Sequence, residues 1–312
     1  LSRLLCLLRL SCLSRMMGTL RETIRLRHST RRYADRSVPD EVLVHLLEFA
    51  ARAPHLTDVP PRVTVVNGRE RVGRILARYL GVYGLVQGAP HLLVGLIPEE
   101  SDRARLDLGY VLEQVVLEAT RLGLSTCWMT GSYHPERAAD EVERRPGEVV
   151  AATVALGYAR EDPLARLHDG TVRRLVAAHR RRPLEEIVFA GKWGVPWSPV
   201  GADPALVEVL ECARLAPSAE NRQPWRFVVE SGAGERSPAL HLFLTGPAPI
   251  DAGIVMAHVA LTGAEVGWDG RWALHWQDPA LARNLGAPPG VIPVGTFFIH
   301  HKGTKTRRRI NN

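Results

Sequence analysis

The chain has 312 residues, 46% of them hydrophobic, which suffices for one large domain or two medium ones and excludes a disordered or fibrous protein. Its formal net charge is +7. Residues 1–16 carry three arginines, residues 302–312 carry five basic residues, and neither segment holds an acid. The rest of the chain, which we call the body, therefore has a charge of −1. The body gives no reason to expect a nucleic-acid partner. We expect the basic tail to be disordered. The alternative interpretation of the tail is an arm that binds nucleic acid.

Residues 1–17 form an apolar run that an arginine interrupts every six residues. A secretory signal needs an uninterrupted apolar stretch and a membrane span needs about 20 apolar residues, and neither is present. We expect a leader or a mis-assigned start ahead of Met16 or Met17, with a transit peptide as the alternative. No other run reaches membrane-spanning length, and the four cysteines show no metal-ligand spacing. The sequence therefore predicts a soluble, cytoplasmic protein without a metal site.

Two stretches of the chain share one helical pattern. PDEVLVHLLEFAARAP begins at Pro39 and DPALVEVLECARLAP begins at Asp203. Both place apolar residues at helical spacing, and both stop at Ala-Pro because proline disfavours helical geometry in the residue before it. A short β-branched strand is expected after each helix, at 63–66 and at 227–229.

A second pair of matching stretches follows in each half. LDLGYVLEQVVLEATRLGLSTCW begins at Leu106 and IDAGIVMAHVALTGAEVGW begins at Ile250. In each, an Asp and a Gly two positions later open a long helix, and a strand-like segment follows at 149–159 or 291–300. The order helix, strand, helix, strand thus occurs twice. We interpret the chain as two diverged copies of one unit, a fused dimer in which a monomer acts as a pseudo-dimer about a pseudo-twofold axis.

The segment between the copies is too apolar and too rich in tryptophan for a flexible linker, so we expect a structured arm. The predicted organisation is a leader 1–17, a first half 18–167, an arm 168–200 that packs on the second half, a second, degenerate half 201–301 and a basic tail 302–312.

Four short motifs occur along the chain: RHSTRRYADRSVP at 27–39, GLSTCWMTG at 123–131, ALGYA at 155–159 followed by RRRPLEEIV at 180–188, and LAPSAENRQPWRF at 215–227. Together, over residues 24–300, they resemble the FMN-dependent nitroreductase family. The Pro-Ser-x-x-Asn-x-Gln-Pro-Trp string is the most specific of them. The resemblance implies an α+β nitroreductase fold, with a mainly antiparallel sheet flanked by helices in each copy.

The resemblance also implies FMN as the cofactor and assigns residues to it. The expected FMN-binding residues are Arg27, His28, Ser29, Arg31, Trp128, Met129, Thr130, Gly131, Arg181, Arg182, Pro217, Ser218, Ala219, Asn221 and Gln223. Arg27, Ser29 and Arg31 alternate along the chain, so on an extended segment their side chains face one side, and guanidinium groups suit a phosphate monoester. In the family, the basic residues before Pro-Leu-Glu-Glu close over the same phosphate. A solvated basic face is the alternative for this segment.

In the family, the loop that carries the Pro-Ser string comes from the partner subunit and lies over the flavin, and the backbone of Trp128–Gly131 passes beside the flavin pyrimidine and N5. The alternatives are a structural turn with Trp225 as a core anchor for the first, and Gly123 as a helix C-cap with Cys127 and Trp128 in the core for the second. For residues 123–131 both interpretations can hold together.

The sequence departs from the family in two ways. The first copy lacks the Pro-Ser string and the second lacks Arg-x-Ser-x-Arg, so we expect one FMN per chain, at the interface of the halves. The first copy also has a helix-like insert, Glu70 to Val86, in which Tyr79 and Tyr83 are candidates to stack on an aromatic substrate; ordinary helix packing is the alternative.

The function that the resemblance implies is an FMN-dependent NAD(P)H oxidoreductase of nitroreductase type. NAD(P)H would give a hydride to flavin N5, and a nitroaromatic, quinone or similar small-molecule acceptor would take the electrons in a ping-pong cycle. The cofactor carries this chemistry, so no catalytic side chain is expected. The alternatives are a flavin-binding or scaffold protein without turnover, or another reaction on the same fold, such as dehalogenation, azoline oxidation or flavin breakdown.

Overall fold

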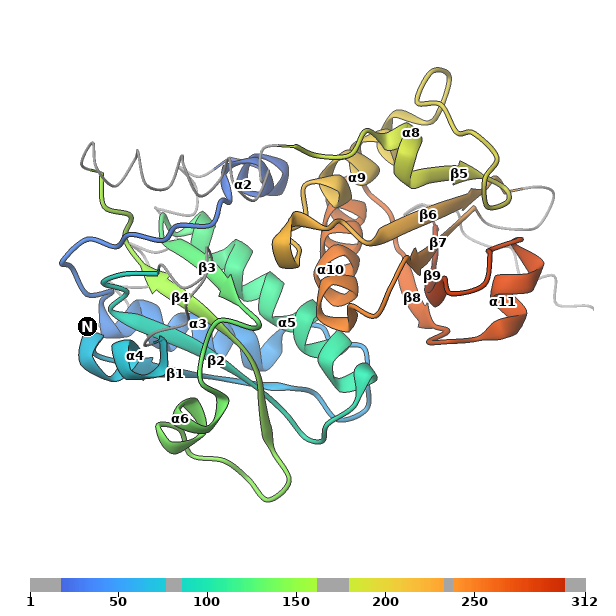
Figure 1. The fold of residues 1–312 in the computed structure, drawn as a ribbon. Coiled ribbons are helices and arrows are strands. Elements are labelled where there is room, and N and C mark those ends of the chain that lie inside the picture. Colours follow the sequence, from blue (N-terminus) through green and yellow to red (C-terminus); the bar gives the residue numbers. More distant parts are fainter. Residues whose placement is uncertain (1–17, 77–85, 162–179, 233–237, 301–312) are drawn as a thin grey trace, which may run out of the picture. The chain divides into compact units, whose positions relative to one another are not determined.

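The computed structural model describes residues 18–76, 86–161, 180–232 and 238–300, which fall into two compact units (Figure 1). Unit 1 extends to Arg181 and also includes Leu215–Gln223 and Pro249–Ala257; unit 2 holds Arg182–Arg214, Pro224–Ala248 and the chain from His258 onward. The leader 1–17, the tail 302–312, residues 168–179 of the expected arm and both Tyr79 and Tyr83 lie outside the described residues. No helix in the described ranges is long and apolar enough to cross a membrane.

Unit 1 is built around a four-stranded sheet with the strand order β1-β2-β4-β3, antiparallel throughout. Its elements are α2 (Leu20–Leu26), α3 (Asp40–Arg52), β1 (Arg62–Asn67), α4 (Arg69–Leu76), β2 (His91–Ile97), α5 (Asp102–Arg121), β3 (Ser125–Met129), α6 (Pro135–Asp140) and β4 (Val149–Gly157).

Strand β2 is buried on both faces, which explains its unbroken apolar run HLLVGLI. Leu92, Val94 and Leu96 point into a core cluster that also contains residues of α4 and α6. Gly95 faces the other way, where a Cβ atom would lie 2.6 Å from a methyl group of Leu108 in α5. Helices therefore cover both faces of this sheet, α4 and α6 on one and α5 on the other (Figure 1).

The sheet of unit 2 has the strand order β5-β6-β7-β9-β8, with β5 parallel to β6 and all other pairs antiparallel. Its elements are α8 (Leu184–Ile187), β5 (Val188–Ala190), α9 (Pro204–Arg214), β6 (Trp225–Glu230), β7 (Ala239–Leu244), the C-terminal part of α10 (Pro249–Glu265), β8 (Arg271–Leu274), α11 (Pro279–Asn284) and β9 (Ile292–Phe298). Strand β5 comes from the segment expected to be an arm.

Apart from β5, the two sheets have the same topology, because β6-β7-β9-β8 repeats the order β1-β2-β4-β3. Each sheet also has one β-bulge on the strand that pairs with its apolar central strand. The extra residue is Ala151 in β4 and Val294 in β9, and each lies two positions before a threonine. The predicted α+β class, with two mainly antiparallel sheets flanked by helices, is confirmed.

The long helices α5 and α10 end in the same way. Gly123 follows α5 and Gly267 follows α10, with φ values of +76° and +90°. In both, the amide of the glycine and the amide after it donate to carbonyls of the last helical turn, which is the Schellman motif. The C-cap role expected for Gly123 is therefore confirmed.

Within unit 1, the start of α10 lies against α5 at backbone contact distance. A Cβ atom on Gly109 would overlap the carbonyl oxygen of Ile250, and a Cβ atom on Gly253 would overlap the carbonyl oxygen of Leu106 and lie 2.6 Å from the amide nitrogen of Tyr110. The atoms that would be struck belong to the backbone, so no side-chain rotation can relieve the overlap. These two positions admit only glycine.

We predict that Gly253→Ala lowers the free energy of unfolding by about 1–3 kcal/mol, because the two helix backbones must separate to admit the methyl group. Gly73→Ala is the matched control, since Gly73 is also helical but a Cβ atom there meets nothing within 4 Å. It should raise the free energy of unfolding by about 0.5–1 kcal/mol through the lower entropy of the unfolded chain. Urea titrations followed by circular dichroism compare the two. Equal stability of both variants would contradict the close backbone contact between α5 and α10.

Candidate functional site

The basic segment that begins at Arg27 is held along strand β3. Helix α2, opened by a capping box between Thr19 and Glu22, ends at Leu26, and the chain then becomes extended. Ser29 forms a parallel bridge with Thr126 of β3, and the amide of Thr30 donates to the Thr126 carbonyl at 2.9 Å. The phosphate-binding residues expected from the sequence therefore lie next to the strand that leads into Trp128–Gly131.

Arg31 is the most buried cation of this segment, with 5% of its surface exposed. Its guanidinium donates to the carbonyl of Ser29 at a long 3.4 Å, and no carboxylate of the described residues pairs with it. Burying a charge without a counter-ion is costly, so this position suits an anionic ligand. Arg27 is half-buried, and the exposed His28 holds its Nδ1 3.0 Å from the Leu26 carbonyl.

The end of β3 is fixed by a buried acid that the sequence analysis did not identify. The indole Nε1 of Trp128 donates to Oε2 of Glu113 at 2.7 Å, and Glu113 lies on α5 with none of its surface exposed. Met129 is buried in the core cluster together with Cys127, as expected for Cys127, whereas Thr130 and Gly131 are exposed. The side chain of Met129 thus serves packing, and the accessible part of this segment begins after it.

The loop Leu215–Gln223 has an unusual backbone. Glu220, Asn221 and Gln223 have φ values of +53°, +53° and +50°. Left-handed geometry costs a residue with a side chain about 1–3 kcal/mol, so three such residues within four positions persist only where the surroundings hold them. The loop therefore depends on its contacts.

One contact comes from the start of α10. Both carboxylate oxygens of Asp251 lie 3.2 Å from the amide nitrogen of Ala219 and accept its hydrogen bond. Within the loop, Ser218 Oγ accepts from the amide of Gln223 at 3.0 Å. Asp251 is 5% exposed, and its burial raises its pKa to about 6.

A second set of contacts comes from Arg180 and Arg181. The Arg181 guanidinium donates from Nη1 to the carbonyl of Ala216 at 2.8 Å and to Oδ1 of Asn221 at 3.0 Å, and from Nη2 to the carbonyl of Leu215 at 3.1 Å. The Arg180 carbonyl accepts from two side-chain amides, Nδ2 of Asn221 at 3.0 Å and Nε2 of Gln223 at 3.1 Å. Two amides expected at a flavin edge and one arginine expected at its phosphate thus contact one another.

The first half has a loop anchored in the same way. Asp107 on α5 accepts from the amides of Leu56 and Thr57 at 2.7 and 3.0 Å and from the Thr57 hydroxyl at 2.6 Å. Burial raises the pKa of Asp107, and these hydrogen bonds oppose the shift. Asp107 and Asp251 are the aspartates that the sequence repeat places two residues before a glycine. The sequence repeat aligns the two halves on these aspartates, but nothing in the sequence indicates that they anchor loops.

Arg182 belongs to unit 2, unlike the other expected site residues that the structure describes. It forms an ion pair with Glu186 at 3.1 Å. Burial, and next the charge of Arg182, lower the pKa of the neighbouring Arg226. Trp225 is fully buried, as the alternative of a core anchor anticipated. Among the described residues, no group of three or more His, Cys, Asp or Glu is placed to hold a metal ion.

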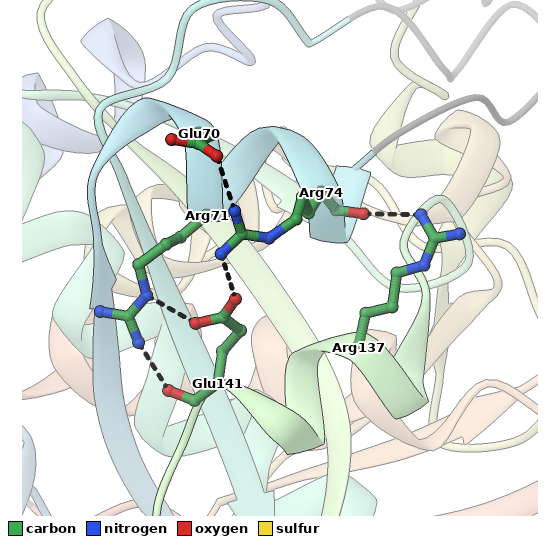
Figure 2. Close-up of polar contacts among 5 residues, drawn as sticks. All are labelled: Glu70, Arg71, Arg74, Arg137 and Glu141. Carbon is green, nitrogen blue, oxygen red and sulfur yellow. Dashed lines mark hydrogen bonds and ion pairs between the residues drawn. The ribbon is translucent and has the colours of Figure 1, made fainter.

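A network of charges fixes α4, the described part of the expected insert, to α6 (Figure 2). Glu141 accepts from Arg71 at 2.5 Å and from Arg74 at 2.9 Å, Arg74 also pairs with Glu70 at 3.0 Å, and Arg137 donates to the Arg74 carbonyl at 2.9 Å. The hydrogen bonds from Arg74 and Arg71 lower the pKa of Glu141. The network holds the helix from which the chain continues toward Tyr79.

The chain is similar to nitroreductases. A family model described as "Putative TM nitroreductase" matches residues 19–263. A protein of Methanothermobacter thermautotrophicus named "Putative NADH dehydrogenase/NAD(P)H nitroreductase" is 30% identical over 152 residues, which are 46% of this chain and 78% of that protein.

Solved structures show the same likeness. A Thermotoga maritima structure described as a "putative nitroreductase" matches with a TM-score of 0.55 at 20% identity, covering 91% of this chain and 94% of that one, and this shared fold spans both halves. A Bacteroides fragilis nitroreductase with bound FMN matches 46% of this chain and 90% of its own at 24% identity, with a TM-score of 0.39.

Asp251 gives a prediction about pH. Because its pKa in the folded protein is about 6, above the 3.9 of an unfolded chain, the folded state binds the proton more tightly between these values. The stability that this group contributes is therefore full below pH 4, decreases as the pH rises from 4 to 6, and is lost above 6, by about 3 kcal/mol in all. Asp251→Asn keeps an oxygen that accepts from Ala219 and cannot ionise.

The measurement is the free energy of unfolding of both proteins in urea between pH 4 and pH 7. We expect the parent protein to lose stability relative to Asp251→Asn as the pH rises, with most of the loss complete at pH 7. A difference between the two that stays constant with pH would contradict the burial described for this carboxyl group.

Proposed function

This chain belongs to the nitroreductase family whose model matches residues 19–263, and from that premise we propose that it is an FMN-dependent NAD(P)H oxidoreductase that reduces a nitroaromatic, a quinone or a similar small molecule. The observation that carries the proposal is Arg31, a buried cation to which the described residues offer no carboxylate. A dianionic phosphate supplies the missing charge and accepts bidentate guanidinium hydrogen bonds.

The residues present fit FMN. Arg27, Ser29 and Arg31 would hold the phosphate, with His28 as a further donor. The segment Trp128–Gly131 would lie beside the ring, and the loop Pro217–Gln223 would cover it. When bound, FMN supplies a ring that accepts a hydride from NAD(P)H and passes electrons to the acceptor.

The chain's own residues then have positioning tasks. Glu113 orients the Trp128 indole through its 2.7 Å hydrogen bond, which fixes the strand end that precedes the exposed Thr130 and Gly131. Asp251 and Ser218 fix the covering loop. A preformed site of this kind binds a rigid ring without ordering the loop at the moment of binding.

We further propose one FMN per chain, with the two halves derived from the duplication of one unit. The shared sheet topology and the paired aspartate anchors support the duplication. In the second half, the position of the basic segment holds Trp193, which packs on Phe189 at 4.9 Å and on Phe243 at 5.6 Å between ring centroids. An aromatic packed in this way offers nothing to a phosphate, which supports a single site.

The name of the Methanothermobacter relative supports NAD(P)H as the electron donor. The sequence holds no Gly-x-Gly-x-x-Gly motif after a strand, so the donor would use the space over the ring and not a separate nucleotide fold.

The first test is the absorbance spectrum of the purified protein, reconstituted with FMN and then mixed with NADH or NADPH without oxygen. We expect flavin bands at one FMN per chain and their loss on addition of one of the two nucleotides. Absence of flavin binding would overturn the proposal. Bound FMN that neither nucleotide reduces would favour a flavin-binding protein without turnover, and two FMN per chain would refute the single site.

The second test is Arg31→Gln, which removes the buried cation. Hydrogen bonds to charged groups contribute about 1.5–3 kcal/mol, so the Kd for FMN should rise by roughly 10- to 100-fold. Arg52→Gln is the control, because Arg52 lies on the exposed face of α3 and pairs only at the surface with Glu48 at 3.6 Å. Quenching of flavin fluorescence measures both. Equal Kd values for the two variants would rule out Arg31 as a phosphate ligand.

A further inference from the structure

Hydrogen bonds join the segment Arg180–Arg181 to the loop Leu215–Gln223. We call the four residues whose side chains or carbonyls make these bonds the latch: Arg180, Arg181, Asn221 and Gln223. Five hydrogen bonds between 2.8 and 3.1 Å join the two segments, and all four residues belong to unit 1. The sequence predicted that Arg181 binds the FMN phosphate. The latch gives this residue another role.

We propose that Arg181 is a positioning residue that locks the covering loop into its left-handed backbone conformation, and that it is not a ligand of the phosphate. The proposal rests on the proposed function, since the loop matters for flavin only if flavin binds. The phosphate is left to Arg27, Ser29 and Arg31.

The guanidinium of Arg181 already donates hydrogen bonds from both of its Nη atoms. Nη1 of Arg181 has two hydrogens, and it donates to two acceptors, the Ala216 carbonyl and Oδ1 of Asn221. Nη2 donates to the Leu215 carbonyl. A phosphate held by both Nη groups would have to displace these bonds, and with them the support of the loop.

Two of the acceptors of Arg181 are backbone carbonyls that follow helix α9. Helix α9 ends at Arg214, and the carbonyls of Leu215 and Ala216 follow directly. Both carbonyls lie beyond the end of the helix, so they take no part in its hydrogen bonds, and Arg181 donates to them. Arg181 therefore has neutral oxygen acceptors within the protein for three of its five N–H groups.

The latch residues of the loop are also residues with left-handed backbone geometry. Asn221 and Gln223, two of the three left-handed residues, are the residues whose side chains reach Arg180 and Arg181. The same amides hold the loop at the points where its backbone is most strained. Removing Arg181 should release the loop even when no flavin is present.

The binding of two flavins distinguishes a residue of the latch from a phosphate ligand. Riboflavin has the ring of FMN and no phosphate. A phosphate ligand affects the binding of FMN alone, whereas a residue that shapes the loop over the ring affects both flavins. Arg181→Gln should therefore raise the Kd values of FMN and riboflavin by the same factor, about tenfold or more, and leave their ratio unchanged. Arg31→Gln should change the ratio.

Hydrogen exchange of the protein without flavin supplies the second readout. The amides of Ala219, Asn221, Arg222 and Gln223 are all hydrogen-bonded in the loop, and they should exchange faster in Arg181→Gln. Arg182→Gln is the matched control, because the neighbouring Arg182 pairs with Glu186 and lies in unit 2. It should leave these amides unchanged. Thermal unfolding by circular dichroism establishes that each variant is folded.

Two results would overturn the latch: unchanged exchange of the loop amides in Arg181→Gln, or a loss of FMN affinity with riboflavin affinity preserved. If the parent protein binds neither flavin, the proposed function fails, while the exchange measurement still decides whether Arg181 holds the loop. Should Arg181→Gln fail to fold, Asn221→Leu, which removes one acceptor of Arg181 and one donor to Arg180, puts the same two readouts to the test.

Discussion

The backbone contact between α5 and the start of α10 is the constraint on which the site depends. Gly109 and Gly253 permit it, because any side chain at either position would strike a carbonyl of the other helix. Two residues before Gly253, Asp251 holds the amide of Ala219 in the covering loop, and four residues after Gly109, Glu113 holds the indole of Trp128. The Asp-x-Gly pattern shared by both halves thus has a physical meaning: the glycine sets the distance between helices and the aspartate anchors a loop.

Four charged side chains of unit 1 differ in what surrounds them, and their roles differ accordingly. Asp251 and Asp107 lie where burial opposes ionisation, and each is stabilised by loop amides. Arg181 is surrounded by carbonyls and an amide oxygen. Arg31, in contrast, is buried with one long contact to a carbonyl, which is why it is the cation best suited to an external anion. The chain's net charge of +7 says little about this site, because four individual side chains and their surroundings decide it.

The sequence was sufficient for the class of fold and for four helices. Helices α3 and α9 have clear apolar periodicity and stop at Ala-Pro, whereas α5 and α10 share the Asp-x-Gly pattern and end at a glycine. The sequence was not sufficient for β2 and β7, whose residues are all buried, because a strand buried on both faces shows no alternation and resembles a short buried helix. Motif resemblance likewise predicted that Arg181 and Arg182 act together. Adjacent side chains on an extended segment point in opposite directions, and here their partners lie in different units.

The composition of the covering loop reflects two competing requirements. Glycine at positions 220, 221 and 223 would remove the backbone cost of left-handed geometry, about 1–3 kcal/mol for each residue. Glycine would also remove the amide groups of Asn221 and Gln223 and with them three of the five bonds of the latch. The sequence has the amide side chains at these positions despite the backbone strain. This choice favours function only where a fixed loop conformation matters more than an unstrained backbone. A loop that must cover a flat ring without rearranging meets that condition, because a flexible loop would lose entropy on every binding event.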